Sequence, residues 1–338
     1  MNPLSRRALL GALPLAALAT RASAQGAAQA GVLSLPRSDV SPRTEWAPDR
    51  AVRIIIPVAP GGSLDILGRS IARALAPALG QPVVAENHAG AGSNLAFELT
   101  ARARPDGLTL LVGSDPLTIN PSLYPRVGYD PVRDFAAIIE MVRAPQVLVV
   151  NPASPVRDLA GFIAAARSAE GAMTVASQGN GSIGHLAGAL FAHERRLVFT
   201  HVPYRGGGPA VLDVVAGHVD ALFVTLPAAI EHIRGGRLRA LAVTSAARNP
   251  ALPDVPSIEN FDVVTWQGLL APAGTPASII TRIAEETSRA LREPALRDSF
   301  TSQGFVVTGS GPEAFAATIR AEAERWPALV RAAGARVE

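Results

Sequence analysis

The chain has 338 residues, contains no Cys, and carries all 31 of its basic side chains as Arg, with a formal net charge of +3. The absence of Cys excludes disulfides, thiolate nucleophiles and Cys-ligated metals. The absence of Lys excludes Schiff-base chemistry and a Walker-type phosphate loop. Three Arg and no acid lie within residues 1–24, so removing that segment would leave a formal net charge of 0. The high pI is therefore no evidence for a nucleic-acid partner.

Residues 1–24 have the pattern of an export signal. An Arg pair at residues 6–7 precedes an apolar run at residues 8–19, which is too short to span a bilayer. An A-x-A site ending at Ala24 predicts cleavage there and a periplasmic mature chain. The Arg pair also fits a twin-arginine signal, so Sec and twin-arginine export both stay open. No later apolar run is long enough for a transmembrane helix, so we expect no membrane insertion of the mature chain.

The mature chain is long enough to fold on its hydrophobic core alone, as two domains. Residues 25–50 are polar and Pro-containing and predict an irregular lead, with a second possible cleavage site at residues 28–30. The order of elements then predicts a first lobe from residues 51–149 plus 264–338. Residues 150–263 would form the second lobe.

The stretch 52–94 is the clearest unit of the sequence. Residues 52–58 are apolar and rich in β-branched side chains, which predicts a buried strand. Gly61 and Gly62 permit a sharp turn, Ser63 is a good helix N-cap, and Asp65 falls in the first helical turn. The apolar residues that follow share one helical face, and Gly80 can end the helix: Leu64, Leu67, Ile71, Leu75 and Leu79.

The same pattern repeats at once. Residues 82–86 predict a strand, 87–93 a Gly-rich loop and 94–103 a helix, before a third strand at 108–113 and a loop at 114–120. Two helix N-termini would then meet at one edge of a parallel sheet, where unpaired N–H groups suit an anion such as a carboxylate. The alternative is that these turns are only connections.

The remaining elements continue the alternation. We expect strands at 135–142, 146–150, 173–176, 197–202, 220–226, 238–244, 263–270 and 305–308. We expect helices at 159–167, 183–193, 208–215, 228–234, 276–292, 294–302 and 312–332. Two α/β lobes joined by two crossings would place Gly-rich loops on both sides of a cleft.

Several loop motifs, in this order, resemble the receptors of tripartite tricarboxylate transporters, the TctC-type or Bug-type periplasmic solute-binding proteins. They are APGGSLD at 59–65, NHAGAGSN at 87–94, ASQGNGS at 176–182 followed by His185 and Leu186, HVPYRG at 201–206, LAVTS at 241–245 and LPDVP at 252–256. The resemblance runs from about residue 51 to residue 331, which is nearly all of the mature chain.

The resemblance implies an α/β, two-lobed type II periplasmic binding protein fold, with a mainly parallel sheet flanked by helices in each lobe. It implies a solute receptor without enzymatic activity or cofactor, which captures a small carboxylate for integral membrane transporter subunits. A receptor whose transporter is absent or encoded elsewhere is also open. It also implies ligand-binding positions at Ala59, Pro60, Gly61, Gly62, Ser63, Asp65, Ala91, Gly92, Ser93, Asn94, Ser114, Ser177, Asn180, Ser182, His185, Tyr204 and Thr225.

The chain departs from the family pattern in three places. The family usually has Pro and Gly where this chain has Ala89 and Ser93. It often has Asp at the position of Thr225, where an acid could meet a ligand ammonium. Thr cannot supply that charge, which argues against an amino-acid ligand.

An exported α/β enzyme is the alternative from another class. Residues 179–184 read G-x-G-x-x-G, the dinucleotide fingerprint, but the next strand ends without an acid for a ribose hydroxyl. Ser182 lacks the nucleophile-elbow pattern of a hydrolase. The His residues have no metal spacing. Asp65 and His185 can also be structural, and Arg205 could clamp a carboxylate or be solvated.

Overall fold

The computed structural model describes residues 46–332 and 334–335. These described residues form a single structural unit. The predicted export signal and most of the predicted irregular lead lie outside the described residues. No helix in the described part of the chain is both long and apolar enough to cross a membrane.

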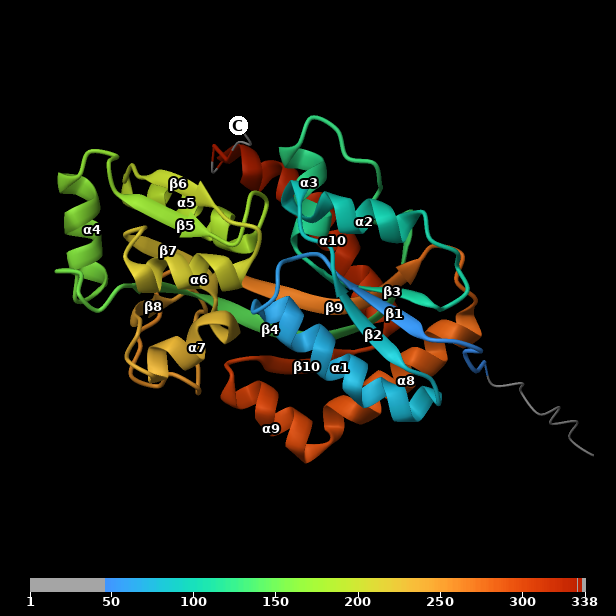
Figure 1. Cartoon of the computed structure of the whole chain (residues 1–338). Helices are drawn as coiled ribbons and strands as arrows, with labels where there is room; N and C mark the ends of the chain where they lie inside the picture. Colours follow the sequence, from blue (N-terminus) through green and yellow to red (C-terminus); the bar gives the residue numbers. More distant parts are fainter. Residues whose placement is uncertain (1–45, 333, 336–338) are drawn as a thin grey trace, which may run out of the picture. The chain divides into compact units, whose positions relative to one another are not determined.

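One half of this unit joins the first strands of the chain to the last ones (Figure 1). Its strands are β1 (Val52–Ile56), β2 (Val83–Asn87), β3 (Thr109–Ser114), β9 (Val264–Pro272), β10 (Val306–Ser310) and the first part of β4 (Phe135–Val150). β1 pairs in parallel with β2 and with β3, whereas β9 runs antiparallel to β3 and β4. The carboxyl ends of β1, β2 and β3 therefore meet at one sheet edge, as predicted.

Helices cover both faces of this half. They are α1 (Ser63–Leu79), η1 (Ala91–Ser93), α2 (Asn94–Ala101), α3 (Pro116–Leu123), α8 (Ala277–Arg292), α9 (Pro294–Ser302) and α10 (Pro312–Ala332). Successive side chains of a strand point to opposite faces. Ile54 and Ile56 accordingly pack with α1, α8 and α9, while Ile55 packs with α2, α3 and α10.

The second half contains the remaining elements. They are α4 (Leu159–Ser168), β5 (Thr174–Ser177), α5 (Ile183–Arg195), β6 (Thr200–Pro203), α6 (Gly207–Ala216), β7 (Ala221–Thr225), α7 (Leu226–Arg234) and β8 (Arg239–Val243). β5 pairs in parallel with β6 and β7, and β4 pairs antiparallel with β7 and β8. The two halves give the two-lobed α/β architecture that the resemblance implies.

β4 links the two halves, because it is one strand of 16 residues shared by both (Figure 1). The prediction of two strands, 135–142 and 146–150, was wrong. A Pro inside a sheet removes a ladder N–H. Pro145 is the last β4 residue paired with β9, and Gln146 is the first paired with β7. The missing N–H thus falls where the pairing partner changes. The lobe boundaries 51–149 plus 264–338, and 150–263, stay a prediction.

The structure of α1 confirms most of what the sequence pattern predicts for this helix. All five residues of its predicted apolar face are buried, and Gly80 ends it with a left-handed backbone at φ 66°. The prediction of Ser63 as N-cap was wrong, because Gly62 occupies that position without a side-chain cap. The Ser63 hydroxyl instead accepts a hydrogen bond of 2.8 Å from Gln267 Nε2 of β9. The Ser63 hydroxyl therefore bonds to a residue far away in the sequence instead of capping the helix.

Residues 114–120 also differ from the prediction of a loop. Ser114 ends β3, and α3 begins two residues later with Pro116 in its first turn. The helix propensity of Thr118, Ile119 and Asn120 is low. All three are buried, and Ile119 packs in a cluster with Trp326 of α10. Tertiary packing therefore forms this helix against its local preference.

Candidate functional site

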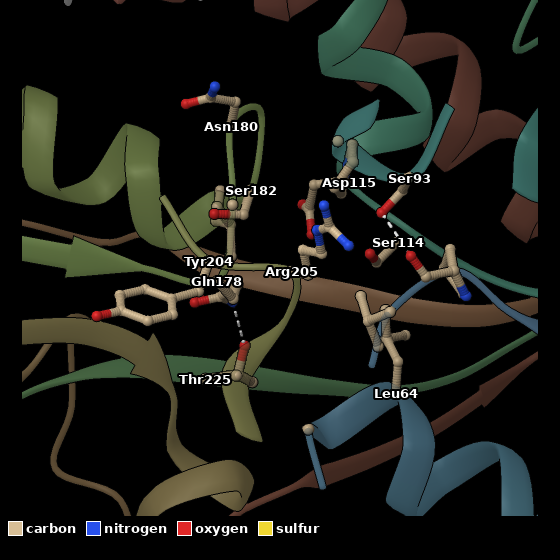
Figure 2. A pocket seen from close by; sticks show the side chains of 18 of the residues that line it. Leu64, Ser93, Ser114, Asp115, Gln178, Asn180, Ser182, Tyr204, Arg205 and Thr225 are labelled. Carbon is tan, nitrogen blue, oxygen red and sulfur yellow. Dashed lines mark hydrogen bonds between the residues drawn. The ribbon is translucent and has the colours of Figure 1, made fainter. Parts of the chain in front are cut away.

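A cavity of about 360 Å³ lies where the loops after β1, β2 and β3 face the loops after β5, β6 and β7 (Figure 2). Thr265 and Gln267 of β9 also line it. Both halves of the chain therefore contribute to one site. Ten of the predicted ligand-binding residues line the cavity: Gly62, Ser63, Ala91, Gly92, Ser93, Ser114, Asn180, Ser182, Tyr204 and Thr225.

The other predicted residues, Ala59, Pro60, Gly61, Asp65, Asn94, Ser177 and His185, are not part of the lining. Ala59 and Pro60 belong to a contact between the two halves. The Ala59 N–H donates to the Arg205 carbonyl at 2.9 Å. A Cβ atom on Gly208 would collide with the Pro60 carbonyl, and one on Gly62 would lie 3.3 Å from the Gly207 nitrogen. Close approach of two glycine backbones thus closes this side of the cavity.

Asp65, in the first turn of α1, bonds to the loop after β1. Its carboxylate accepts hydrogen bonds from Gly61 N–H at 3.0 Å, Arg69 Nε at 2.9 Å and Asn87 Nδ2 at 2.9 Å. The side chain is buried. The Gly61 bond ties the loop after β1 to α1, the Asn87 bond ties β2 to α1, and the Arg69 bond lies within α1, so the acceptors of Asp65 are occupied by structural contacts.

The loop after β2 has an unusual backbone. Gly90, Ala91, Gly92 and Ser93 all have positive φ, at 142°, 47°, 61° and 77°. Residues other than Gly are disfavoured there by roughly 1–2 kcal/mol each. The Ser93 hydroxyl donates to the Pro57 carbonyl at 3.0 Å, which ties the strained turn to the end of β1. Such strain is typical of sites where a backbone must face a ligand.

Asn94 and Asn120 hold this turn in place. Asn120 Nδ2 donates to Asn94 Oδ1 at 2.7 Å and to the Gly92 carbonyl at 2.8 Å. Asn120 also faces the second half, because a Cβ on Gly181 would collide with its Oδ1. Asn94 therefore acts on the cavity through the turn rather than from its wall.

The loops after β5, β6 and β7 form the second wall of the cavity, and the loops after β1, β2 and β3 form the first. Ser177 and His185 lie behind the second wall. The Ser177 hydroxyl is 2.8 Å from His201 Nε2, and the His185 and His201 rings stack at 4.2 Å. Burial lowers the pKa of His201 to about 4, and burial with the neighbouring His201 lowers that of His185 to about 3. Both rings are therefore neutral at pH 7. Ser177 is buried and no acid bonds to either described ring, so these groups do not form a hydrolase triad.

The polar side chains of the second wall mostly bond to one another. Gln178 Nε2 donates to Thr225 Oγ1 at 2.8 Å and to Gln146 Oε1 at 3.2 Å, and Gln146 Nε2 donates to Thr225 Oγ1 at 3.3 Å. Ser182 caps α5 by accepting from the His185 N–H at 3.2 Å. This wall is thus a network in which the donors are paired before any ligand enters, while the buried Gln178 Oε1 has no partner in the described chain.

Tyr204 and Asn180 line the cavity mainly with their backbones. Figure 2 shows both side chains pointing away from Ser93 and Ser114 on the opposite wall. The Tyr204 hydroxyl donates to Asp213 Oδ2 at 2.6 Å. Burial and the Asp213 carboxylate raise the pKa of Tyr204 to about 12. Its phenol is therefore a structural donor.

The first wall keeps polar groups available. The Ser114 hydroxyl makes no hydrogen bond to any described residue, although Ser114 is buried at the cavity wall. Ser63 accepts from Gln267 and so retains its own hydroxyl proton. Ser93 donates to Pro57 and retains its lone pairs. Hydroxyls with spare donors and acceptors can bind the oxygens of a small polar ligand.

Two charged residues of the lining, Arg205 and Asp115, are not among the predicted ligand-binding residues, although the sequence left open that Arg205 clamps a carboxylate. Arg205 is the one cationic side chain among the described lining residues; it has no hydrogen-bond or ion-pair partner in the described chain, and it points into the cavity in Figure 2. Asp115 lies on the opposite wall and is buried, and that burial raises the pKa of its carboxyl to about 8.

Gln178, Thr265 and Gln267 were also missed. Thr265 and Gln267 are polar residues two apart in an otherwise apolar strand, which is the signal that could have revealed one side facing a cavity. Asp115 directly follows a strand at the predicted binding edge, which was a second usable signal. The described residues contain no cluster of His, Cys, Asp and Glu that could hold a metal ion.

Solved structures show a close similarity in fold. The periplasmic binding protein BugD matches with a TM-score of 0.82 and 29% identity, over 86% of this chain and 100% of that one. An R. palustris protein solved with adipate matches with a TM-score of 0.83 and 31% identity, over 86% and 99%. MatC from Rhodopseudomonas palustris, with bound malate, matches with a TM-score of 0.80 and 33% identity, over 84% and 99%.

Sequence comparisons agree. Protein BugT of Bordetella pertussis (strain Tohama I) is 36% identical over 298 residues, which cover 86% of this chain and 91% of BugT. The model of the tripartite tricarboxylate transporter family receptor matches residues 67–335. Such receptors are solute-binding proteins that work with membrane transporters, and the family implies a periplasmic location. This chain belongs to the tripartite tricarboxylate transporter receptor family.

Proposed function

We propose that this chain is a periplasmic receptor that captures a small carboxylate between its two lobes and presents the closed form to membrane transporter subunits. The observation that carries the proposal is the cavity shared by both halves, with the Arg205 guanidinium, which no described residue pairs, directed into it. A guanidinium binds carboxylates through two parallel hydrogen bonds. Opposite it, the Ser114 hydroxyl and the strained turn at Gly90–Ser93 offer further donors.

The contacts around the cavity support capture by closure. The backbone bond between Ala59 and Arg205 and the packing of Gly62 on Gly207 join the two halves at the cavity mouth. A ligand that touches both walls stabilises this closed arrangement relative to an open one, since it binds the closed state better. Closure would then be what the transporter recognises.

Two related structures contain dicarboxylates, adipate in one and malate in the other. Their folds and the family membership support a carboxylate ligand for this chain. Nothing in the comparisons supports a dinucleotide-dependent oxidoreductase or a hydrolase, and the role proposed here needs no catalysis or cofactor. Export through residues 1–24, with cleavage near Ala24 by either route, belongs to the same proposal. N-terminal sequencing of protein recovered from the periplasm tests it.

A thermal-shift screen of the mature chain against adipate, malate, citrate, aromatic acids, amino acids and NADP tests the function. A ligand at 100 times its dissociation constant stabilises the protein by about 2.7 kcal/mol, which corresponds to a shift on the order of 5 °C. We expect a shift with one class of carboxylate. A shift with NADP alone would contradict the receptor and favour the motif at 179–184.

Isothermal titration of the best carboxylate then tests the role of Arg205. Arg205→Gln removes the positive charge and should weaken binding at least tenfold, because charge-assisted bonds to a carboxylate are lost. Arg157→Gln is the matched control, since Arg157 is also exposed and lies outside the cavity lining. Equal affinities of Arg205→Gln and Arg157→Gln would show that Arg205 does not bind the ligand.

A further inference from the structure

Asp115 is the acidic side chain of the cavity wall, and its surroundings are unusual for a charged group. Its side chain is 1% exposed. One carboxyl oxygen, Oδ2, accepts a short hydrogen bond from the hydroxyl of Thr265. The other, Oδ1, is buried and has no hydrogen-bond partner in the described chain. The carboxyl thus has one neutral partner and one oxygen without a partner in the described chain, on a residue that lines the cavity.

The charged groups that face Asp115 lie on several elements. Glu322 and Arg325 approach from α10, and Arg143 approaches from β4. Arg325 bonds to Glu322 at 2.8 Å, and Arg143 bonds to Glu140 at 2.7 Å, so each cation already has an acidic partner. Arg205 points into the cavity from the opposite wall in Figure 2. No cation forms a hydrogen bond with Asp115 in the described chain.

A buried carboxylate in such surroundings is costly. Removing an ion from water costs several kcal/mol unless cations or several hydrogen bonds replace the solvent. The Thr265 hydroxyl supplies a single neutral bond, and Glu322 adds a like charge. The carboxyl therefore favours its protonated form, in which Oδ1 can carry the proton and needs an acceptor.

We infer that Asp115 holds a proton that it donates to an oxygen of the bound ligand, so that carboxylate binding is coupled to proton uptake by the receptor. The inference rests on the carboxylate-receptor function proposed above and narrows it. The ligand presents an anionic or hydroxyl oxygen to the β3–α3 corner, and it has no ammonium there. Asp115 then acts as a specificity-determining residue of the first wall.

The sign of the coupling follows from the charges. Burial raises the pKa of Asp115 to about 8 in the ligand-free receptor. A ligand carboxylate beside it adds negative charge and raises the pKa further. Above about pH 8, the free receptor loses the proton that the bound receptor keeps, so affinity falls toward tenfold per pH unit. A ligand ammonium at the same place would have the opposite effects: binding would release a proton, and affinity would rise with pH.

Isothermal titration of the mature chain with adipate and malate between pH 6 and pH 9, in two buffers of different ionisation enthalpy, tests the inference. We expect affinity to be level up to about pH 8 and then to fall severalfold by pH 9, with up to one proton taken up per ligand. In Asp115→Asn the affinity should vary less than twofold across this range, with no proton uptake. Thermal unfolding of the variant verifies that it is folded.

Glu322→Gln is the matched control, because Glu322 is the neighbouring, partly buried acid whose pKa is also raised by burial. If Asp115 carries the coupling, the affinity of Glu322→Gln still falls as the pH rises. The fall begins at lower pH, because removing the negative charge of Glu322 lowers the pKa of Asp115. Coupling that disappears in Glu322→Gln and persists in Asp115→Asn overturns the inference, as does binding that is independent of pH in the unaltered chain. Failure of every carboxylate to bind would instead overturn the proposed function itself.

Discussion

The two walls of the cavity are built in different ways. On the second wall, Gln178 and Gln146 both donate to Thr225 Oγ1 and Ser182 caps a helix, so that Gln178 Oε1 is the one buried side-chain oxygen of this group without a partner in the described chain. On the first wall, Ser114 has no partner among the described residues, and Asp115 has a carboxyl oxygen without one. The second wall is thus formed before the ligand arrives, whereas the first keeps the groups that would discriminate among ligands.

This difference predicts where substitutions act. Changes to the first wall should alter binding, because unsatisfied groups there have a ligand as their natural partner, and they should alter the pH dependence of binding and stability through the buried Asp115 carboxyl. Changes to the second wall should mainly alter stability, because they break bonds that already exist. The contact between the walls should mainly affect binding, since three large hydrophobic clusters each belong to one half and only a small one joins α3 and α10 to α5 in the described chain.

The largest effect expected is on stability, from Asp115→Asn. The folded-state pKa of Asp115 is raised from 3.8 to about 8, so its contribution to stability is full below about pH 4 and is lost as the pH rises to about 8. Each pH unit in that window corresponds to at most about 1.4 kcal/mol. The variant should therefore gain several kcal/mol relative to the unaltered chain between pH 4 and pH 8. Chemical denaturation across that range, without ligand, is the measurement, and parallel curves would contradict a buried protonated acid.

The next effect concerns the contact between the walls, tested by Gly208→Ala. Its Cβ would collide with the Pro60 carbonyl, but its φ is negative and lies in α6, where Ala is favoured by roughly 0.5–1 kcal/mol. We expect unchanged or higher thermal stability together with an affinity at least about 100-fold lower, because closure is blocked. Gly311→Ala is the control, since no atom lies within 4 Å of its Cβ position. Normal affinity in Gly208→Ala would show that ligand binding does not require this contact.

A smaller loss is expected on the second wall, from Thr225→Val. The substitution keeps the side-chain shape but removes the acceptor of Gln178 and Gln146, which leaves buried amides unsatisfied. That costs about 1–3 kcal/mol. Thr200→Val, on the exposed face of β6, should stay within about 0.5 kcal/mol. Denaturant titration compares them, and an equal cost at both sites would mean that the network contributes no stability.

The strand–Gly loop–helix units predicted two α/β lobes, because they leave strong local signals, and the family resemblance implied the ten residues that line the cavity. The sequence pattern missed Thr265 and Gln267, since a strand's contribution to a cavity depends on pairing with β3 and β4 far away in the chain. It assigned Ser63 to a helix cap because local rules cannot see Gln267. It could not tell that Tyr204 lines the cavity with its backbone while its hydroxyl bonds Asp213. The sequence pattern shows neither the orientation of a side chain nor the pairing of strands that are far apart in the chain.

The smallest effect sharpens the account of the first wall, because it separates backbone strain from polar chemistry. Ala91 has φ 47°, in a region that costs a non-Gly residue roughly 1 kcal/mol. Ala91→Gly relieves this strain but adds chain entropy to the unfolded state, so the net gain should be at most about 1 kcal/mol. Ala89→Gly, in the same loop but without a positive φ, should lose about 0.5–1 kcal/mol. Opposite signs in denaturant titration would show that the turn is held against its preference, and matching losses would show that it is not strained.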